Sequence, residues 1–385
     1  MPEVAPSALR VPHSRIREIA ELAMSMEGVY KLYFGESDIP TPNFIKEAAA
    51  RAMASGFTYY TENAGMPSLR RGLAAYYERI HNVTLDTSRF VVTASGVQAL
   101  NVGIRCTLDP GDEAIVLTPA WPNGSAIVRM SNATPIEIPL LLSNGRFTLD
   151  FDAMEAAVST RTKLLIYTSP SNPLSWVATV DEQQRLLDFA RRHKLWLLAD
   201  EVYDRLCYRG ASIAPSILKL ASDNDAILIA QSFSKAWCMT GWRLGWLIAR
   251  PDLASRAAYF NEYIISCASA ISQKAGEAAL NEGEPFIEEL LTRLRENRDY
   301  CRHALSSIPG VTVPEPEGAF YLFPKIEGLK DSFAFCKDLL LACKVGLAPG
   351  AAFGAGGEGS VRLCYAADCS VLEPAMERIH KFMTR

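Results

Sequence analysis

Short runs of apolar residues alternate with longer segments of helical periodicity from about residue 90 onward. One amphipathic segment, 181–193, has its apolar residues at the spacing of one helix face. The short runs are almost continuously apolar, which is typical of strands that are covered on both faces of a sheet. We therefore predict an α/β fold with a mostly parallel sheet flanked by helices. The predicted strands are 89–93, 113–118, 163–169, 195–200 and 226–232.

The C-terminal part of the chain has a different pattern. Residues 283–302 form a charged amphipathic stretch, and a strand-like run follows at 318–323. A chain of 385 residues is also longer than one compact core usually requires. We predict a large α/β domain over 46–289 and a smaller α+β domain built from 1–45 and 290–385.

Composition and charge exclude several classes of protein. The net charge is −4, and no basic block with interleaved aromatic residues is present, so a nucleic-acid partner is not expected. The nine cysteines include no C-x-x-C pair, which favours reduced thiols in a cytoplasmic protein over a disulfide framework or a metal site. The longest apolar runs are far too short to span a bilayer, and the N-terminus does not look like a signal peptide.

The segment with the clearest chemistry is Ser232-Phe-Ser-Lys-Ala-Trp237, followed by Thr240-Gly-Trp-Arg243. A predicted strand ends at Ser232, so Lys235 is expected at the carboxyl edge of the sheet, where ligands of α/β proteins bind. In a partly desolvated, cation-rich site the pKa of an amine falls, and the amine can then act as nucleophile and base. Ser232 and Arg243 can hold a phosphate. A solvated surface lysine is the ordinary alternative.

This segment resembles the lysine signature of the class I/II aminotransferases, the fold type I pyridoxal phosphate enzymes related to aspartate aminotransferase. The resemblance extends over nearly the whole chain, from about Phe34 to Arg362. It implies a large cofactor-binding domain, a Schiff base between Lys235 and pyridoxal 5′-phosphate, and contacts from Ser232 and Arg243 to the cofactor phosphate.

Two further motifs follow the family's order. In Asp200-Glu-Val-Tyr203 the resemblance implies that Asp200 pairs with the pyridine nitrogen and that Tyr203 bonds the ring hydroxyl. A helix-capping aspartate is the alternative. Asn172, in Asn172-Pro173, matches a second ligand of the ring hydroxyl. The family usually continues with threonine and glycine, but here 174–176 are Leu-Ser-Trp, a change that we expect to affect the shape of the substrate site.

Other cofactor contacts are implied by position. Ser95, Gly96 and Val97 lie between a strand and a helix, where free N–H groups and the helix dipole favour an anion, and they match the family's phosphate cup. Trp121 matches the aromatic residue that stacks on the ring. Tyr60 matches a tyrosine that reaches the phosphate of the neighbouring subunit, so the resemblance implies a homodimer with shared active sites.

The substrate contacts are expected from both ends of the chain. Arg362 matches the arginine that binds the substrate α-carboxylate with its planar fork, although a surface charge is the alternative. Gly35 would let the backbone approach the same carboxylate, and Phe320 would line the pocket unless it belongs to the core.

The resemblance implies an aminotransferase, which moves the amino group of an L-amino acid to a 2-keto acid through an aldimine on Lys235. Lys235, Asp200 and Tyr203 are the predicted catalytic residues. A lyase that uses the same cofactor for β-elimination of a sulfur amino acid or for decarboxylation is the alternative, because it would share these residues. A ligand-sensing regulator would need a DNA-binding domain, and the residues before Phe34 are too few for one.

Overall fold

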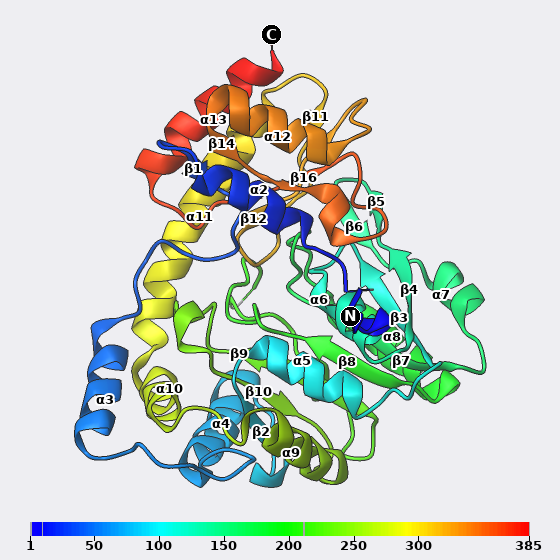
Figure 1. The fold of residues 1–385 in the computed structure, drawn as a ribbon, viewed down its shortest axis with the longest axis vertical. Coiled ribbons are helices and arrows are strands. Elements are labelled where there is room, and N and C mark those ends of the chain that lie inside the picture. The colour runs from blue at the N-terminus through cyan, green and yellow to red at the C-terminus, as the bar shows by residue number, and fades with distance from the viewer. Residues whose placement is uncertain (1, 10, 211, 385) are drawn as a thin grey trace.

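The computed structural model describes residues 2–9, 11–210 and 212–384, and a seven-stranded sheet lies at its centre (Figure 1). Strand β10 runs antiparallel to both of its neighbours, while the five strands from β9 to β4 are parallel. In spatial order the strands are β2 (Phe90–Thr93), β10 (Gly245–Ile248), β9 (Ile227–Ser232), β8 (Trp196–Asp200), β7 (Thr162–Thr168), β3 (Glu113–Thr118) and β4 (Thr134–Pro139).

The predicted α/β class is confirmed, and each of the five predicted strands agrees with the structure to within one residue at either end. Every residue of β2, β3 and β9 is buried, which is why these strands are apolar without alternation. Successive side chains of a strand enter two separate apolar clusters. Val116 and Leu228 belong to one cluster, and Leu117 and Ile229 belong to the other.

Helices cover both faces of this sheet. One face packs against α5 (Gly96–Arg105), α6 (Asn123–Met130) and α9 (Pro251–Ile265). The other packs against α4 (Pro67–His81), α8 (Val180–His193) and α10 (Ala270–Glu282). Thr179 begins α8 with a capping box to Glu182, and the predicted helix 181–193 agrees with it. The remaining helices are α1 (Pro6–Leu9), α2 (Arg15–Met24), α3 (Asn43–Ala54), α7 (Phe151–Ala157), α11 (Glu284–Ser306), α12 (Ser332–Cys343) and α13 (Cys369–Met383).

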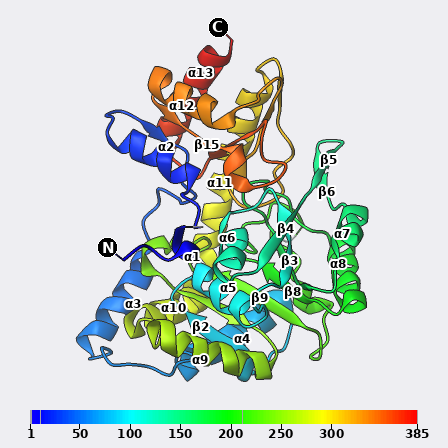
Figure 2. The same ribbon diagram turned by 45° about the vertical axis from the view of Figure 1, so that its right-hand side comes forward.

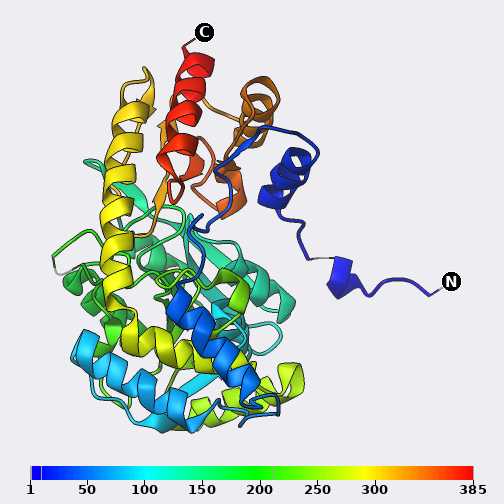
Figure 3. The ribbon, with the colours of Figure 1, turned by 90° about the vertical axis from the view of Figure 1, so that its left-hand side faces the viewer.

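The C-terminal region forms a separate layer above the sheet, and the N-terminal segment joins it (Figures 1 and 3). Strand β1 (Tyr30–Lys31) pairs in parallel with β14 (Val345–Gly346). A three-stranded sheet has the order β12 (Tyr321–Leu322), β16 (Val361–Cys364) and β15 (Ala348–Pro349). The minor strands are β5 (Leu141–Ser143) paired with β6 (Arg146–Thr148), and β11 (Val311–Thr312) paired with β13 (Lys325–Ile326).

The long helix α11 continues from the large layer into the C-terminal one, and Figure 2 shows the β5–β6 hairpin beyond β4. The predicted domain boundary at residue 290 falls inside α11, and the division into two domains remains a prediction. The predicted strand 318–323 is shorter in the structure, where only Tyr321–Leu322 is paired. Ala319 before it has a left-handed backbone, with φ of 55°, which interrupts the extended conformation.

Within the ranges given above, no helix combines the length and the apolar character that crossing a membrane requires.

Candidate active site

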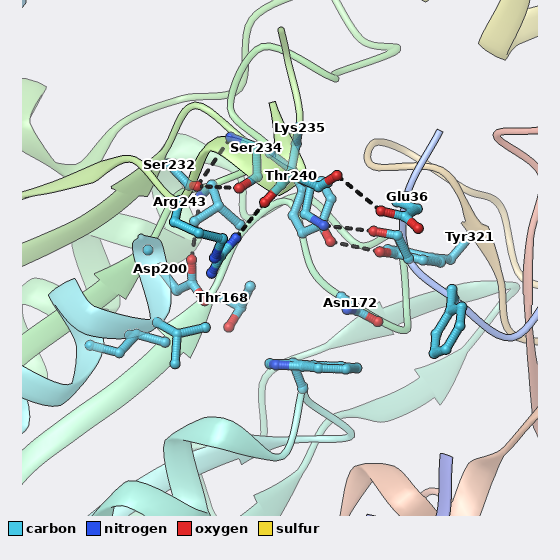
Figure 4. Close-up of a pocket in the computed structure, with 18 of the residues that line it drawn as sticks. Glu36, Thr168, Asn172, Asp200, Ser232, Ser234, Lys235, Thr240, Arg243 and Tyr321 are labelled. Atoms are coloured by element: carbon cyan, nitrogen blue, oxygen red, sulfur yellow. Dashed lines mark hydrogen bonds between the residues drawn. The ribbon is translucent and has the colours of Figure 1, made fainter. Parts of the chain in front are cut away.

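Strands β7, β8 and β9 end side by side at Thr168, Asp200 and Ser232, and a cavity of about 580 Å³ opens at this edge of the sheet (Figure 4). The carboxyl ends of parallel strands meet here, which is where α/β folds bind ligands. Ten of the residues singled out from the sequence line the cavity: Gly35, Gly96, Val97, Trp121, Asn172, Asp200, Tyr203, Ser232, Lys235 and Arg243.

Lys235 lies on the loop after β9, and its Nζ donates a hydrogen bond to the carbonyl oxygen of Gly35 at 2.6 Å. The amine is also 5.7 Å from the centre of the Tyr203 ring. The pKa of Lys235 is lowered to about 8, chiefly because burial removes hydration from the charged amine. Cys364 and Glu36 oppose this shift, and the positive charges of Arg362 and Arg243 add to it. An amine with this pKa is available as a nucleophile and base near neutral pH.

Asp200 is a buried carboxylate at the end of β8. It accepts a hydrogen bond from the N–H of Val202 at 3.3 Å, and among the described residues no cation lies within ion-pair distance of it. Burial raises the pKa of Asp200 to about 7, and the charge of Lys235 counteracts this only in part. A buried acid without a counter-ion is a suitable partner for a cationic aromatic nitrogen supplied by a ligand.

The beginning of α5 and the loop after β9 form one side of the cavity. Ser95 is the N-cap of α5, and its Oγ accepts a hydrogen bond from the N–H of Gln98 at 3.1 Å. A Cβ atom on Gly96 would lie 3.1 Å from the Cβ of Ser232, so glycine lets the helix start approach this strand. Arg243 adds a full positive charge. Helix N-terminus, hydroxyl and guanidinium together suit a phosphate.

Arg362 is fully buried beside the cavity, so the interpretation of this residue as a surface charge is wrong. It donates to the Oδ1 of Asn172 at 2.8 Å and to the carbonyl oxygen of Tyr33. Its Nε is buried and has no hydrogen-bond partner within the described part of the chain. A guanidinium that has one unpaired N–H group and lies beside a cavity can bind a carboxylate ligand.

Phe320 and Tyr60 lie outside the wall of this cavity. Phe320 is buried, with its ring 5.5 Å from that of Tyr203. Tyr60 is 87% exposed and lines a different hollow, together with Tyr59 and residues 267–271. Residues 174–176 are buried and are not among the residues that line the cavity, so they do not shape it by direct contact.

Sequence reasoning missed several residues that line the cavity: Arg17, Glu36, Thr168, Ser234, Thr240 and Tyr321. Tyr321 directly follows Phe320, and only the pairing of β12 with β16 decides which of the two side chains faces the cavity. Arg17 belongs to α2, and no motif in the sequence connects this helix with the site. Glu36 accepts a hydrogen bond from Thr240 at 2.9 Å, a contact between residues about 200 positions apart.

Residues 28–379 match the family model described as aminotransferase class I and II. The aspartate aminotransferase of Pyrococcus horikoshii is 36% identical over 98% of this chain and 96% of its own length. The aromatic-amino-acid aminotransferase 2 of Thermococcus litoralis is 32% identical over 96% of this chain and 95% of its own length. The solved alanine aminotransferase of Pyrococcus furiosus superposes with a TM-score of 0.93 at 29% identity, covering 99% of this chain and 100% of that one.

The family match covers the whole sheet, the loop of Lys235 and the strand of Arg362. The relatives named above differ in the amino acid that their names give, but each is named as an aminotransferase. The chain therefore belongs to the class I and II aminotransferases and is a pyridoxal-phosphate-dependent transaminase.

Proposed function

We propose that Lys235 is the residue that binds pyridoxal phosphate, and that its amine, once released, removes the proton from Cα of the amino acid substrate. The observation that carries this proposal is an amine with a pKa lowered to about 8, in the same cavity as a buried carboxylate without a counter-ion. When bound, pyridoxal phosphate supplies an aldehyde that an amine can attack and a ring that accepts electron density from the substrate.

The other residues of the cavity would hold the cofactor. Asp200 would keep the ring nitrogen protonated, since no cation among the described residues lies within ion-pair distance of its carboxylate. Tyr203 and Asn172 would bond the ring hydroxyl, and Trp121 would stack on the ring. The phosphate would be held by Ser95, Gly96, Val97, Ser232 and Arg243. The unpaired buried acid and the open helix start support this arrangement because both need a ligand to complete their interactions.

The substrate would be an L-amino acid, with a 2-keto acid as the second substrate. Arg362 would bind the α-carboxylate through its free N–H group, and the backbone at Gly35 would lie beside it. Phe320 would support the pocket from behind Tyr203. The names of the relatives favour transamination over β-elimination or decarboxylation.

Replacement of Lys235 by alanine tests the proposal. We expect loss of the visible absorbance of the lysine-bound cofactor and a fall in turnover of about 10⁴-fold, because nucleophile, acid and base are removed together. Lys274→Ala is a matched control, since Lys274 pairs with Glu277 outside the cavity. A panel of amino acids with 2-oxoglutarate separates the reactions. Release of ammonia without amino-group transfer would contradict the transaminase assignment. Normal turnover in Lys235→Ala would show that Lys235 neither binds the cofactor nor transfers the proton.

We also propose that the protein is a homodimer in which Tyr60 of each subunit reaches the phosphate in its partner's active site. The loop of Tyr60 lies beside the end of α9, where Asn63 donates to Glu262 at 2.8 Å. Large apolar side chains are exposed on both segments, as is common at an interface between subunits. These side chains are Phe57, Tyr59, Tyr60, Tyr259, Phe260, Tyr263 and Ile264.

Two neighbouring tyrosines offer a matched test of the dimer. Tyr59 and Tyr60 are 84% and 87% exposed, so removal of either hydroxyl disturbs the single chain equally little. We expect Tyr60→Phe to weaken cofactor binding by roughly tenfold and Tyr59→Phe to leave it unchanged. Sedimentation should give the mass of two chains. A monomeric mass with full activity would contradict the proposal.

We further propose that the enzyme acts in the cytoplasm. All nine cysteines are unpaired, which supports a reducing compartment.

A further inference from the structure

The hydroxyl groups of two buried tyrosines meet at the cavity. The Oη of Tyr203 and the Oη of Tyr321 are 2.6 Å apart, and Figure 4 shows Tyr321 near Asn172 and Glu36. Tyr321 comes from β12 and Tyr203 from the segment after β8, so this contact joins two layers of the molecule. No motif in the sequence predicted it.

We infer that Tyr321 is a positioning residue, which Ser175 holds in place and which directs the hydroxyl proton of Tyr203 toward the cofactor. The inference rests on the proposed function, in which Tyr203 donates to the ring hydroxyl oxygen of pyridoxal phosphate. It adds two residues to that site, and neither of them follows from the proposed cofactor contacts.

The surroundings of Tyr321 leave its hydroxyl one protein partner. Within the described part of the chain, Tyr203 is the residue that hydrogen-bonds to this hydroxyl. The backbone of Gly35 packs closely against the Tyr321 hydroxyl, since a Cβ atom on residue 35 would lie 2.3 Å from the Tyr321 oxygen. The guanidinium of Arg362 lies 4.7 Å from the centre of the Tyr321 ring. The ring is therefore fixed on both sides, with its hydroxyl aimed at Tyr203.

The direction of the hydrogen bond follows from counting protons. Burial raises the pKa of both Tyr203 and Tyr321 above the usual value for a phenol, so both keep their protons at neutral pH. Each hydroxyl then has one proton to donate. When Tyr203 donates its proton to an acceptor in the cavity, its oxygen is free to accept from Tyr321. A hydroxyl that accepts one hydrogen bond donates a stronger one, because the two bonds polarise each other.

Ser175 holds the backbone of Tyr321. Its Oγ donates to the carbonyl oxygen of Tyr321 at 2.7 Å and accepts from the N–H of Tyr321 at 3.3 Å. Ser175 is buried and has a left-handed backbone with φ of 54°, a conformation in which glycine is the unstrained residue. Glycine would lack the hydroxyl and with it both bonds to Tyr321. The serine in the Leu-Ser-Trp segment thus reaches the cavity indirectly, through Tyr321.

The charged and titratable groups around Tyr203 come from several elements. They are Asp200 at the end of β8, Lys235 after β9, Arg362 and Cys364 on β16, and Tyr321 on β12. A change at Tyr321 leaves the others in place, so it isolates the effect of one hydrogen bond on Tyr203.

The test is the pH midpoint of the visible absorbance change of the cofactor-loaded enzyme. Donation from Tyr203 favours the ionised ring oxygen, so a weaker donor raises this midpoint. We expect Tyr321→Phe to raise it by roughly 0.5 to 1 pH unit. Tyr365→Phe is the matched control, because Tyr365 is equally buried and its hydroxyl bonds the Tyr208 hydroxyl at 3.0 Å outside the cavity. Its midpoint should stay within about 0.2 units of the parent enzyme.

Ser175→Gly provides a second variant, which relieves the left-handed backbone and removes the hydroxymethyl group that bonds Tyr321. We expect a rise in the midpoint of about 0.3 units, smaller than for Tyr321→Phe. An unchanged midpoint in Tyr321→Phe, while Tyr203→Phe raises it, would overturn the inference and leave the proposed function intact. If Tyr321→Phe does not fold, an unchanged midpoint in Ser175→Gly would overturn it instead. An enzyme that lacks the lysine-bound absorbance altogether would refute the proposed function itself.

Discussion

The cavity has two walls that are built in different ways. The sheet-edge wall consists of Gly96, Asp200, Ser232 and Lys235, which lie at or just after the ends of strands in one sheet. The C-terminal wall consists of Gly35 and Tyr321, which come from opposite ends of the chain, and the buried Arg362 packs against the Tyr321 ring. The shape of this wall depends on the antiparallel register of β12 and β16, and on the hydrogen bond from Cys364 N to Leu32 O at 2.9 Å.

The two walls also differ in how their polar groups are satisfied. On the sheet-edge wall the charges lack ion-pair partners among the described residues, and burial shifts the pKa of both Asp200 and Lys235 toward neutrality. On the C-terminal wall Arg362 is held by Asn172 and the backbone of Tyr33. We expect the groups with shifted pKa values to serve reaction steps and the held guanidinium to serve binding. Mutations on the two walls should therefore have different kinetic effects.

The largest effect is expected on the sheet-edge wall. Asp200→Asn keeps the size of the side chain but removes its negative charge, so kcat should fall by about 10²- to 10³-fold, measured at saturating substrate. Glu201→Gln is the control, because Glu201 is the next residue, is buried and bonds the N–H of Ile217 outside the cavity. An equal fall in kcat in the two variants would mean that loss of any buried carboxylate slows the reaction, and that the position of Asp200 has no special role.

A smaller effect, mainly on KM, is expected on the C-terminal wall. Arg362→Lys retains a positive charge but loses the planar fork, so kcat/KM should fall by about 10- to 100-fold through weaker binding of the carboxylate. Arg378→Lys is the control, because Arg378 also donates to a backbone carbonyl and packs on a tyrosine ring, but away from the cavity. A fall confined to kcat would contradict the distinction between the two walls.

Arg17 lies on neither wall and tests whether the cavity selects among substrates. Its guanidinium packs 5.7 Å from the Phe34 ring, lines the cavity and has no ion-pair partner among the described residues. We expect Arg17→Ala to raise KM for dicarboxylic substrates by about tenfold and to affect neutral ones less. Arg15→Ala is the control on the same helix, because Arg15 packs on Phe333 instead. Equal changes for both substrate classes would show that Arg17 does not distinguish them.

The smallest effect concerns stability without cofactor. The pKa of Asp200 is about 7 in the folded chain and about 3.9 in an unfolded one, so the folded state binds more protons between these values. Stability of the wild-type protein should therefore fall as pH rises from about 4 to 7. In urea denaturation, the free energy of unfolding of Asp200→Asn should gain roughly 1 kcal/mol relative to wild type between pH 6 and pH 7. A constant difference across this range would contradict the raised pKa.

Much of the sheet-edge wall was predictable from local patterns. The apolar runs that end at Asp200 and Ser232 identify buried strands, and polar residues at those ends identify the ligand-binding edge. The resemblance to the family then assigned Lys235 and its neighbours to cofactor chemistry. The C-terminal wall was predicted less well. Phe320 was proposed as the lining residue, and the side chain that lines the cavity is Tyr321.

The sequence by itself determined the α/β class and the order of the strands along the chain, because burial on both faces and turn-forming residues leave local patterns. The resemblance to the family supplied the candidate residues for the chemistry. Only the tertiary structure decided that Tyr321 meets Tyr203, that Ser175 holds Tyr321 and that Arg17 and Glu36 reach the cavity. These contacts join segments far apart in the chain. Their geometry depends on strand register and on the packing of layers, which no local pattern of residues specifies.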